Sequence, residues 1–321
     1  MSDPWWQTLS ILPVCMLLAG IIIFSLINFR EPVQAPLLLT ILLTTFFCGT
    51  FGYTAYTAAR GFALTGSPGN IFFGSAMLVY SGAALMAAYG MNRPESANAS
   101  ITAFSISTAL SGILHVVGAV STSARFGLRR IDKNRIQRLV LAGVGSALAI
   151  LAIVATSYRG LLTAFYTPWG SPTQCLRIIQ GATVGLFALS TLFFIRFYLI
   201  RRAMFFYWYA LALALLTVGL FGIMLGKGYT SALSWAGHVA QYLSAPYVII
   251  AYLWVGKSAR GQDIPVGRAL DRFFREATAN YQALVETATD AIISFDHEGR
   301  ILLWNSAAER MFGFDAADGP A

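Results

Sequence analysis

Long apolar runs separated by short polar loops occupy the chain up to residue 260. Eight of these runs are long enough to cross a lipid bilayer as helices, which takes about 20 mainly apolar residues each. They lie at residues 8–28, 36–58, 71–91, 101–122, 138–157, 176–199, 205–225 and 231–255. The pattern predicts an all-α polytopic membrane bundle of eight transmembrane helices, which forms a first domain over residues 1–260.

The hydrophobic pattern changes after this domain. The stretch GQDIPVG predicts a hinge, and RALDRFFREATANYQALVETATD after it predicts a helix, so residues 261–288 form a linker helix region. Its apolar positions, at steps of three and four, are Leu270, Phe273, Phe274, Ala277, Tyr281 and Leu284. This stripe fits two arrangements: a helix packed on its own domain, or a parallel homodimer helix that carries a signal away from the membrane.

Residues 289–321 alternate apolar and polar positions like a soluble domain. AIISFD and RILLWN predict two strands joined by a tight turn at HEG, which makes a hairpin. Ser306 is followed three residues later by Glu309, which matches a capping box, so a helix is expected to start there. The third region is therefore expected to be α+β.

The stretch LVETATDAIISFDHEGRILLWNSAAERMFGF resembles the first third of a PAS domain. The resemblance rests on the rhythm D-x-x-G-x-I-x-x-W-N-x-A-A-E-x-x-F-G, which is typical of sensory PAS modules that follow membrane anchors. It implies a sheet covered by helices with a ligand pocket between them. Because this stretch is too short to bury the core of a whole domain, we expect a truncated α+β PAS domain.

The stretch AFYTPWGSPTQCLRIIQGATVGLFALSTLFFI, together with SWAGHVAQYLSAPYVIIAYL, is similar to membrane-associated sensor domains of the third MASE type. The similarity covers residues 5–260, most clearly their second half. These eight-helix input modules of bacteria and archaea precede PAS, histidine kinase or diguanylate cyclase domains. The resemblance implies a sensor in the cell inner membrane whose output enzyme lies downstream, and it leaves the stimulus and any cofactor unknown.

Composition and charge agree with a membrane protein. The chain is 57% hydrophobic and 11% charged, against about 25% charged in ordinary soluble domains. Residues 1–260 hold 17 Lys and Arg against 4 Asp and Glu, whereas residues 261–321 hold 5 against 10. The basic residues lie in short loops between apolar runs, so they are expected to set topology and not to bind nucleic acid.

Alternate loops carry the basic residues. They are the stretch SARFGLRRIDKNRIQR, the group Arg196, Arg201 and Arg202, and the pair Lys257 and Arg260. The positive-inside rule makes these loops cytoplasmic, and eight spans then put both termini in the cytoplasm. Seven spans would put the basic loops and the soluble tail on opposite sides of the membrane, so we reject that count.

Polar side chains inside a bilayer are costly and are functional candidates. The eighth run holds the densest set: Ser234, Trp235, His238, Gln241, Tyr242 and Ser244. Steps of four and three put Ser234, His238 and Gln241 on one helix face, with the two aromatic side chains beside it. This face fits a site for a polar ligand, a quinone head group or a proton, and it fits equally a set of hydrogen bonds to neighbouring helices.

His115 in the fourth run is the other intramembrane histidine. The depths of His115 and His238 along their helices differ by roughly 10 Å, so one shared metal is not expected. The three cysteines lack a C-x-x-C spacing, and no cluster of metal-ligating residues is present in the sequence. Arg177 either snorkels to the lipid headgroups or faces an anionic ligand.

The loop between the fifth and sixth runs is rich in aromatic residues. Tyr158, Phe165, Tyr166 and Trp169 fit an interfacial belt, or they roof a binding cavity. In the seventh run, Gly222-x-x-x-Gly226 permits a close helix contact.

The sequence contains no P-loop, nucleophile elbow or kinase ATP-binding motif, so no catalytic site is predicted within it. The alternative to a sensor is a transporter or channel with a regulatory cytoplasmic tail. The few acidic residues before residue 261 lie in termini or loops, which argues against ion-coupled transport.

Overall fold

The computed structural model describes residues 5–27, 41–42, 45, 49–65, 68–90, 94–123, 134–162, 165–167, 171–226, 231–270, 272–273, 285, 287–295 and 301–314. The chain divides into two compact units, residues 1–273 and residues 274–321. Each unit is described by itself.

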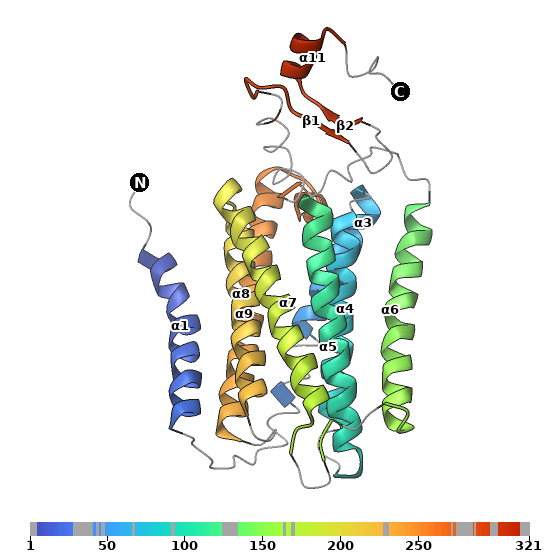
Figure 1. The fold of residues 1–321 in the computed structure, drawn as a ribbon, viewed down its shortest axis with the longest axis vertical. Helices are drawn as coiled ribbons and strands as arrows, with labels where there is room; N and C mark the ends of the chain where they lie inside the picture. Colours follow the sequence, from blue (N-terminus) through green and yellow to red (C-terminus); the bar gives the residue numbers. More distant parts are fainter. Residues whose placement is uncertain are drawn as a thin grey trace. The chain divides into compact units, whose positions relative to one another are not determined.

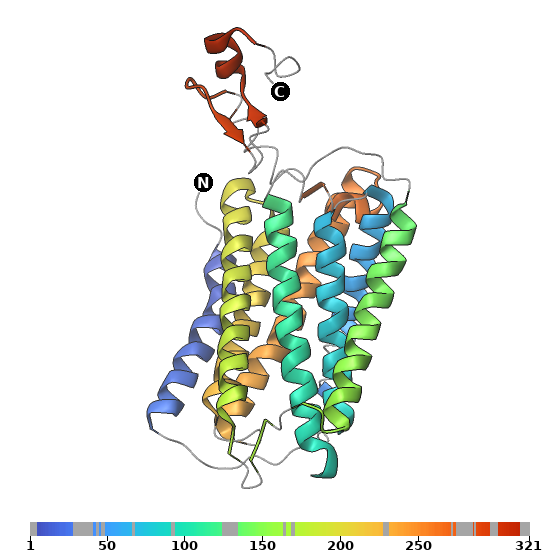
Figure 2. The same ribbon diagram turned by 45° about the vertical axis from the view of Figure 1, so that its right-hand side comes forward.

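The first unit is a bundle of long helices that run alternately in opposite directions (Figures 1 and 2). They are α1 (Trp5–Leu26), α3 (Thr50–Thr65), α4 (Pro68–Gly90), α5 (Pro94–Ser123), α6 (Arg135–Tyr158), α7 (Gln174–Arg201), α8 (Met204–Leu225) and α9 (Ala232–Gly261). Helices α1 and α6 lie at opposite edges of the bundle (Figure 1).

Six of the described helices, α1 and α5 to α9, are long and apolar enough to cross a membrane. Helix α4 holds a shorter apolar stretch, Gly69–Leu85, and α3 has only 16 residues. The prediction of an all-helical membrane region is therefore confirmed for the part of the chain described here. Residues 36–40, 43–44 and 46–48 of the second predicted run lie outside the described residues, so eight crossings stay a prediction.

Apart from the start of α3, before which residues 36–49 lie largely outside the described residues, three helix ends differ from the predicted runs by more than one turn. They are the end of α3 at Thr65 instead of residue 58, the start of α5 at Pro94 instead of residue 101, and the end of α9 at Gly261 instead of residue 255. Hydropathy marks only the apolar part of a helix, whereas polar turns stay helical when their side chains find partners. In α3 the guanidinium carbon of Arg60 lies 5.9 Å from the ring centroid of Tyr56, so the charge is tolerated within the helix.

The closest helix contact in the core joins α8 to α9 through glycines. A Cβ atom added to Gly219 would lie 2.6 Å from the carbonyl oxygen of Gly237, and one added to Gly237 would lie 2.9 Å from the backbone nitrogen of Ile223. Gly222 faces the same contact, because its added Cβ would lie 3.0 Å from the Cα of Gly237. Gly226, the other member of the predicted Gly222-x-x-x-Gly226 pair, ends α8, and its added Cβ would meet the hydroxyl oxygens of Ser234 and Ser231 at the start of α9.

Helix α1 joins this pair through hydroxyl groups. The hydroxyls of Ser10 and Tyr207 lie 2.6 Å apart, and Tyr247 donates to the carbonyl oxygen of Ser10 at 2.8 Å. Further along α1, Ile21 is fully buried against α8 and α9. Helix α1 is therefore fixed to α8 and α9 at two levels, around Ser10 and around Ile21.

After α9 the described chain forms an exit segment, residues 262–270 and 272–273, with one turn and a short helix. Leu270 is fully buried, and the ring of Phe273 stacks on Phe205 of α8 with 6.1 Å between centroids. The predicted continuation of the linker helix lies largely outside the described residues. The remaining positions of the predicted stripe lie there too: Phe274, Ala277, Tyr281 and Leu284.

The second unit contains β1 (Ile293–Phe295), β2 (Ile301–Trp304) and α11 (Ser306–Phe312). The two strands pair antiparallel, with a register irregularity between Ser294 and Phe295. The predicted pair of strands and the helix after them are thus confirmed, while the predicted HEG turn lies outside the described residues.

The predicted capping box at Ser306 is wrong, because the N-cap of α11 is Asn305. Its Oδ1 atom accepts from the backbone N–H groups of Ala308 and Ile292, each at 2.9 Å. Its Nδ2 atom donates to the carbonyl oxygens of Val285 at 2.8 Å and Asp290 at 3.0 Å. One buried amide therefore satisfies four backbone groups, which a serine hydroxyl cannot do.

We expect Gly237→Ala to destabilise the bundle, because the added methyl group has no space between α8 and α9. The cost of such overpacking is about 1–3 kcal/mol. The matched control in the same helix is Gly256→Ala, where an added Cβ meets nothing within 4 Å. Thermal unfolding of the detergent-solubilised protein measures both variants, and equal midpoints for the two would contradict the contact.

We expect Asn305→Ala to release the start of α11 and its links to the preceding chain. Loss of the cap alone costs about 1 kcal/mol, so amide hydrogen exchange over residues 301–312 of the full chain should accelerate about fivefold or more. Ser306→Ala is the control, since a capping box at Ser306 would make that substitution the more harmful one.

Candidate functional site

The polar face predicted on α9 points into the bundle. Ser234, His238, Gln241 and Ser244 are all buried in the described structure. The helix starts just before them, where the hydroxyl of Ser231 caps it by accepting from the backbone N–H of Ser234. The close approach of α8 at the glycine contact covers this face and removes it from lipid.

His238 is held by its neighbours on the same helix. Its Nδ1 atom lies 3.4 Å from Oε1 of Gln241, and its ring lies 6.2 Å from the ring of Tyr242 and 6.1 Å from that of Trp235. The Nε2 amide of Gln241 is buried and makes no hydrogen bond to any residue that the structure describes. A donor without a partner inside a bundle is costly, which distinguishes this face from a fully satisfied set of helix-to-helix hydrogen bonds.

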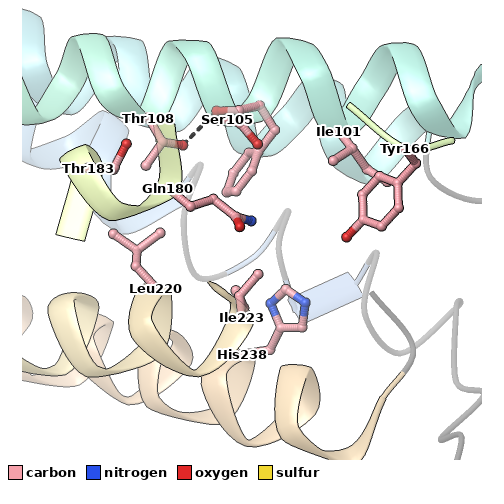
Figure 3. A pocket seen from close by; sticks show the side chains of 10 residues that line it. Ile101, Ser105, Thr108, Tyr166, Gln180, Thr183, Leu220, Ile223 and His238 are labelled. Carbon is pink, nitrogen blue, oxygen red and sulfur yellow. Dashed lines mark hydrogen bonds between the residues drawn. The ribbon is translucent and has the colours of Figure 1, made fainter. Parts of the chain in front are cut away.

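His238 opens onto a cavity of about 50 Å³ between α5, α7, α8 and α9. Its lining residues are Ile101, Phe104, Ser105, Thr108, Tyr166, Gln180, Thr183, Leu220, Ile223 and His238. Figure 3 shows the amide of Gln180 and the imidazole of His238 extending into it from two different helices, with the ring of Tyr166 at one end. The helices thus bring together polar groups that lie far apart in the sequence.

The cavity presents hydrogen-bonding groups without a charge. The hydroxyls of Thr108 and Thr183 each donate to the backbone carbonyl four residues earlier, at 2.7 Å, so their oxygens are left to accept. The amide of Gln180 supplies both donors and acceptors, and the lining contains no Asp, Glu, Lys or Arg. Drug-sized ligands need about 300–1,000 Å³, so the cavity fits ordered water or a neutral polar molecule of a few atoms.

The loop after α6 closes this cavity. The Oδ1 atom of Asn98 accepts from the backbone N–H groups of Phe165 at 3.1 Å and Tyr166 at 3.2 Å, and its Nδ2 atom donates to the carbonyl oxygen of Tyr166. Phe165 is buried and Tyr166 lines the cavity, so these two residues favour the predicted cavity roof over a lipid belt. Tyr158 is half exposed, with its hydroxyl 2.8 Å from that of Ser100, and Trp169 lies outside the described residues.

Two other predicted candidates lie away from the cavity. His115 is buried with both ring nitrogens in use: Nδ1 lies 2.9 Å from the carbonyl oxygen of Ser111, and Nε2 lies 3.2 Å from the hydroxyl of Tyr209. His115 therefore serves as a hydrogen-bonding residue that joins α5 to α8. Arg177 is exposed in the first turn of α7. Within the described residues no group of three His, Cys, Asp or Glu side chains is placed to hold a metal ion.

The sequence interpretation missed several lining residues. They are Ser105, Thr108, Gln180 and Thr183, with Asn98 as the anchor of the roof. Gln180 is an amide inside the sixth apolar run, and this signal alone could have marked it. The hydroxyl residues carry no such signal, because serine and threonine commonly bond to their own helix backbone in membrane spans.

A continuous series of aromatic ring contacts leads from the cavity wall to the exit segment. The rings meet with centroids 4.9–6.2 Å apart. The series runs from Phe104 to Tyr80, Phe187, His115, Phe73, Tyr209, Phe205 and finally Phe273. Phe104 lines the cavity and Phe273 belongs to the exit segment, so the two places are joined by packed side chains.

We expect Asn98→Ala to free the roof of the cavity, because it removes all three bonds to the Phe165–Tyr166 backbone. Each bond contributes about 1 kcal/mol, so hydrogen exchange of these two amides should rise about tenfold or more. Asn98→Asp keeps the acceptor oxygens and should retain most protection. Ser100→Ala, on the same helix, removes only the contact to Tyr158, and an equal effect there would contradict this anchoring role.

The comparisons with known proteins concern the second unit. A family model described as PAS fold matches residues 279–319. No curated protein and no solved structure matches the chain. The predicted resemblance of the last residues to a PAS domain is therefore confirmed, and the resemblance of residues 5–260 to a MASE-type sensor domain stays a prediction.

Proposed function

We propose that this chain is the membrane-embedded sensory input module of a bacterial or archaeal signalling protein. A small-molecule or membrane-derived stimulus acts on the bundle, and α9 and the exit segment relay it to a cytoplasmic PAS domain. That domain in turn controls a histidine kinase or diguanylate cyclase in the complete protein. The PAS match and the apolar helices support a signalling role at a membrane.

One observation carries this proposal: a single helix joins the cavity to the exit segment. Helix α9 holds His238 near its start and runs without a break to Gly261. The exit segment follows directly, and Gly267 lies so close to α3 that an added Cβ would be 2.8 Å from the backbone nitrogen of Gly61. A shift of α9 must therefore displace the exit segment or break its packing, because packed interfaces switch between arrangements and do not deform continuously.

The proposed orientation rests on the ends of the helices and their charges. Gln7 near the start of α1 lies beside Met204 at the start of α8, which is the end of the bundle where α9 finishes. Arg202 and Arg260 lie at this end as well. The positive-inside rule then supports a cytoplasmic location for both termini in the cell inner membrane, with eight crossings if α3 and α4 also span the bilayer.

The stimulus acts, in this proposal, on the cavity and the buried face of α9. The residues are His238, Gln241, Tyr242, Trp235 and Ser234, joined by Gln180 of α7. Binding of a polar molecule would add hydrogen bonds to His238 and Gln180, and this differential stabilisation would shift α9 between two positions.

A homodimer through the linker helix is part of the same proposal, with one restriction. Leu270 and Phe273 already pack on the bundle, which favours the own-domain alternative at these two positions. A dimer contact would then rest on the later stripe residues: Phe274, Ala277, Tyr281 and Leu284.

A transporter or channel is the less favoured alternative. Between Trp5 and Gly261 the described helices contain one acidic residue, Glu95, in the first turn of α5. Ion-coupled transporters need charged groups near the middle of the membrane, which these helices lack.

A double-mutant cycle tests the relay. A reporter histidine kinase is fused after residue 290, and its basal phosphorylation in membranes is measured for His238→Ala, Phe273→Ala and the double variant. We expect each single substitution to change output, and the double variant to depart from the product of the two effects by about fivefold or more, because coupled sites are non-additive.

Arg268→Ala is the control for the exit segment, since this side chain is exposed. It should leave output unchanged and combine multiplicatively with His238→Ala. If the effects of His238→Ala and Phe273→Ala on output also multiply exactly, the cavity and the exit segment act independently. The proposed relay would then be wrong.

A further inference from the structure

A second hollow lies at the other end of α8 and α9 from the ligand cavity. It is a cleft of about 420 Å³ lined by Met204, Phe205, Trp254, Lys257, Ser258, Gly261, Gln262 and Phe273. Trp254 follows His238 by sixteen residues on α9, which is about 24 Å along a helix. The cleft is therefore a separate site from the cavity.

One wall of the cleft is apolar and well ordered by ring packing. Phe205 is fully buried and stacks on Phe273 with an interplanar angle of 15°. Met204 and Trp254 continue this wall and remain partly accessible. A groove of this kind, at the end of membrane helices, fits a hydrocarbon chain better than a water-soluble molecule.

The rim of the cleft is cationic. The Nζ atom of Lys257 lies 4.9 Å from the ring centroid of Trp254, which holds the ammonium over the cleft wall. Gln262, which also lines the cleft, accepts a hydrogen bond from Nη1 of Arg272 at 2.6 Å. A second positive charge therefore lies next to a lining residue.

The chain segments around the cleft also carry a net positive charge. From residue 196 to residue 273 the sequence contains two acidic residues, Asp263 and Asp271. Against them stand the basic residues Arg196, Arg201, Arg202, Lys257, Arg260, Arg268 and Arg272. The chemistry selects an anion, and the apolar wall beside it selects an anion that carries hydrocarbon.

We propose that this cleft binds one anionic phospholipid of the surrounding membrane. The phosphate lies at Lys257, and one acyl chain lies along Met204 and Trp254. Lysine suits this role because its ammonium is a compact point charge with three donors. The cleft lies where α8 begins and α9 ends, at the level that lipid headgroups occupy.

This inference goes beyond the proposed sensory function and adds regulation to it. Phe273 of the exit segment forms part of the cleft, so an occupying lipid touches the element that leaves the bundle. Lipid composition would then bias the same packing contact, Phe205 against Phe273, on which the relay depends.

Native mass spectrometry of the purified full chain in a non-ionic detergent tests the site. The protein is titrated with phosphatidylglycerol and, separately, with phosphatidylcholine of identical acyl chains. We expect tighter binding of one phosphatidylglycerol, and Lys257→Gln should weaken it about fivefold, the usual contribution of one basic residue near a lipid surface. Lys257 is exposed, so this substitution should not disturb folding.

Two controls sharpen the result. Arg177→Gln removes an exposed basic residue at the opposite end of the bundle and should leave the affinity unchanged, whereas an equal loss would reveal general charge attraction and overturn the site. Inorganic phosphate should not displace the lipid, and displacement would assign the cleft to a free anion instead. Equal binding of the two lipids would also overturn the proposal. The readout is binding and not kinase output, so each of these failures leaves the proposed sensory function standing.

Discussion

The close contact between the backbones of α8 and α9 is the constraint on which the rest of the bundle depends. It exists because Gly219, Gly222 and Gly237 carry no Cβ atom at the point where the helices meet. With a side chain at any of them the helices would separate, and the polar face of α9 would lose its cover. Small residues serve this purpose in membranes, where apolar burial alone does not drive helices together.

The two candidate sites follow from this one contact, at opposite ends of the same helix pair. Near the start of α9 the contact turns His238 and Gln241 inward, where α5 and α7 complete a small cavity. Near its end the same pair forms the apolar wall that receives Phe273. Helix α9, which joins the two sites, has 30 residues and contains Pro246. Proline removes one backbone hydrogen bond, and α9 nevertheless stays one helix from Ala232 to Gly261.

Hydropathy predicted the helical membrane region well, because every helix in a bilayer must satisfy its backbone internally and show an apolar exterior. It also predicted the inward polar face of α9, since a helix repeats with a known period. The extents of α3 and α5 were not predictable in this way. Their polar end turns depend on partners such as Tyr56 for Arg60, or the Phe165–Tyr166 backbone for Asn98.

The cavity and the cap of α11 illustrate a second limit of sequence reasoning. Gln180 and His238 face one cavity only because of how α7 packs near α9, and spacing along one helix carries no such information. At α11 the local pattern of Ser306 and Glu309 favoured a capping box, but Asn305 holds two acceptor and two donor contacts across the unit. Long-range hydrogen bonds outweighed a local motif.

The absence of Asp, Glu, Lys and Arg from the cavity lining has an electrical consequence. A transmembrane voltage exerts force on charge, at about 2.3 kcal/mol per elementary charge for each 100 mV. Entry of an uncharged guest among uncharged walls moves no charge through that field. Under the sensory function proposed above, occupancy of the cavity by such a guest would therefore not depend on the membrane voltage.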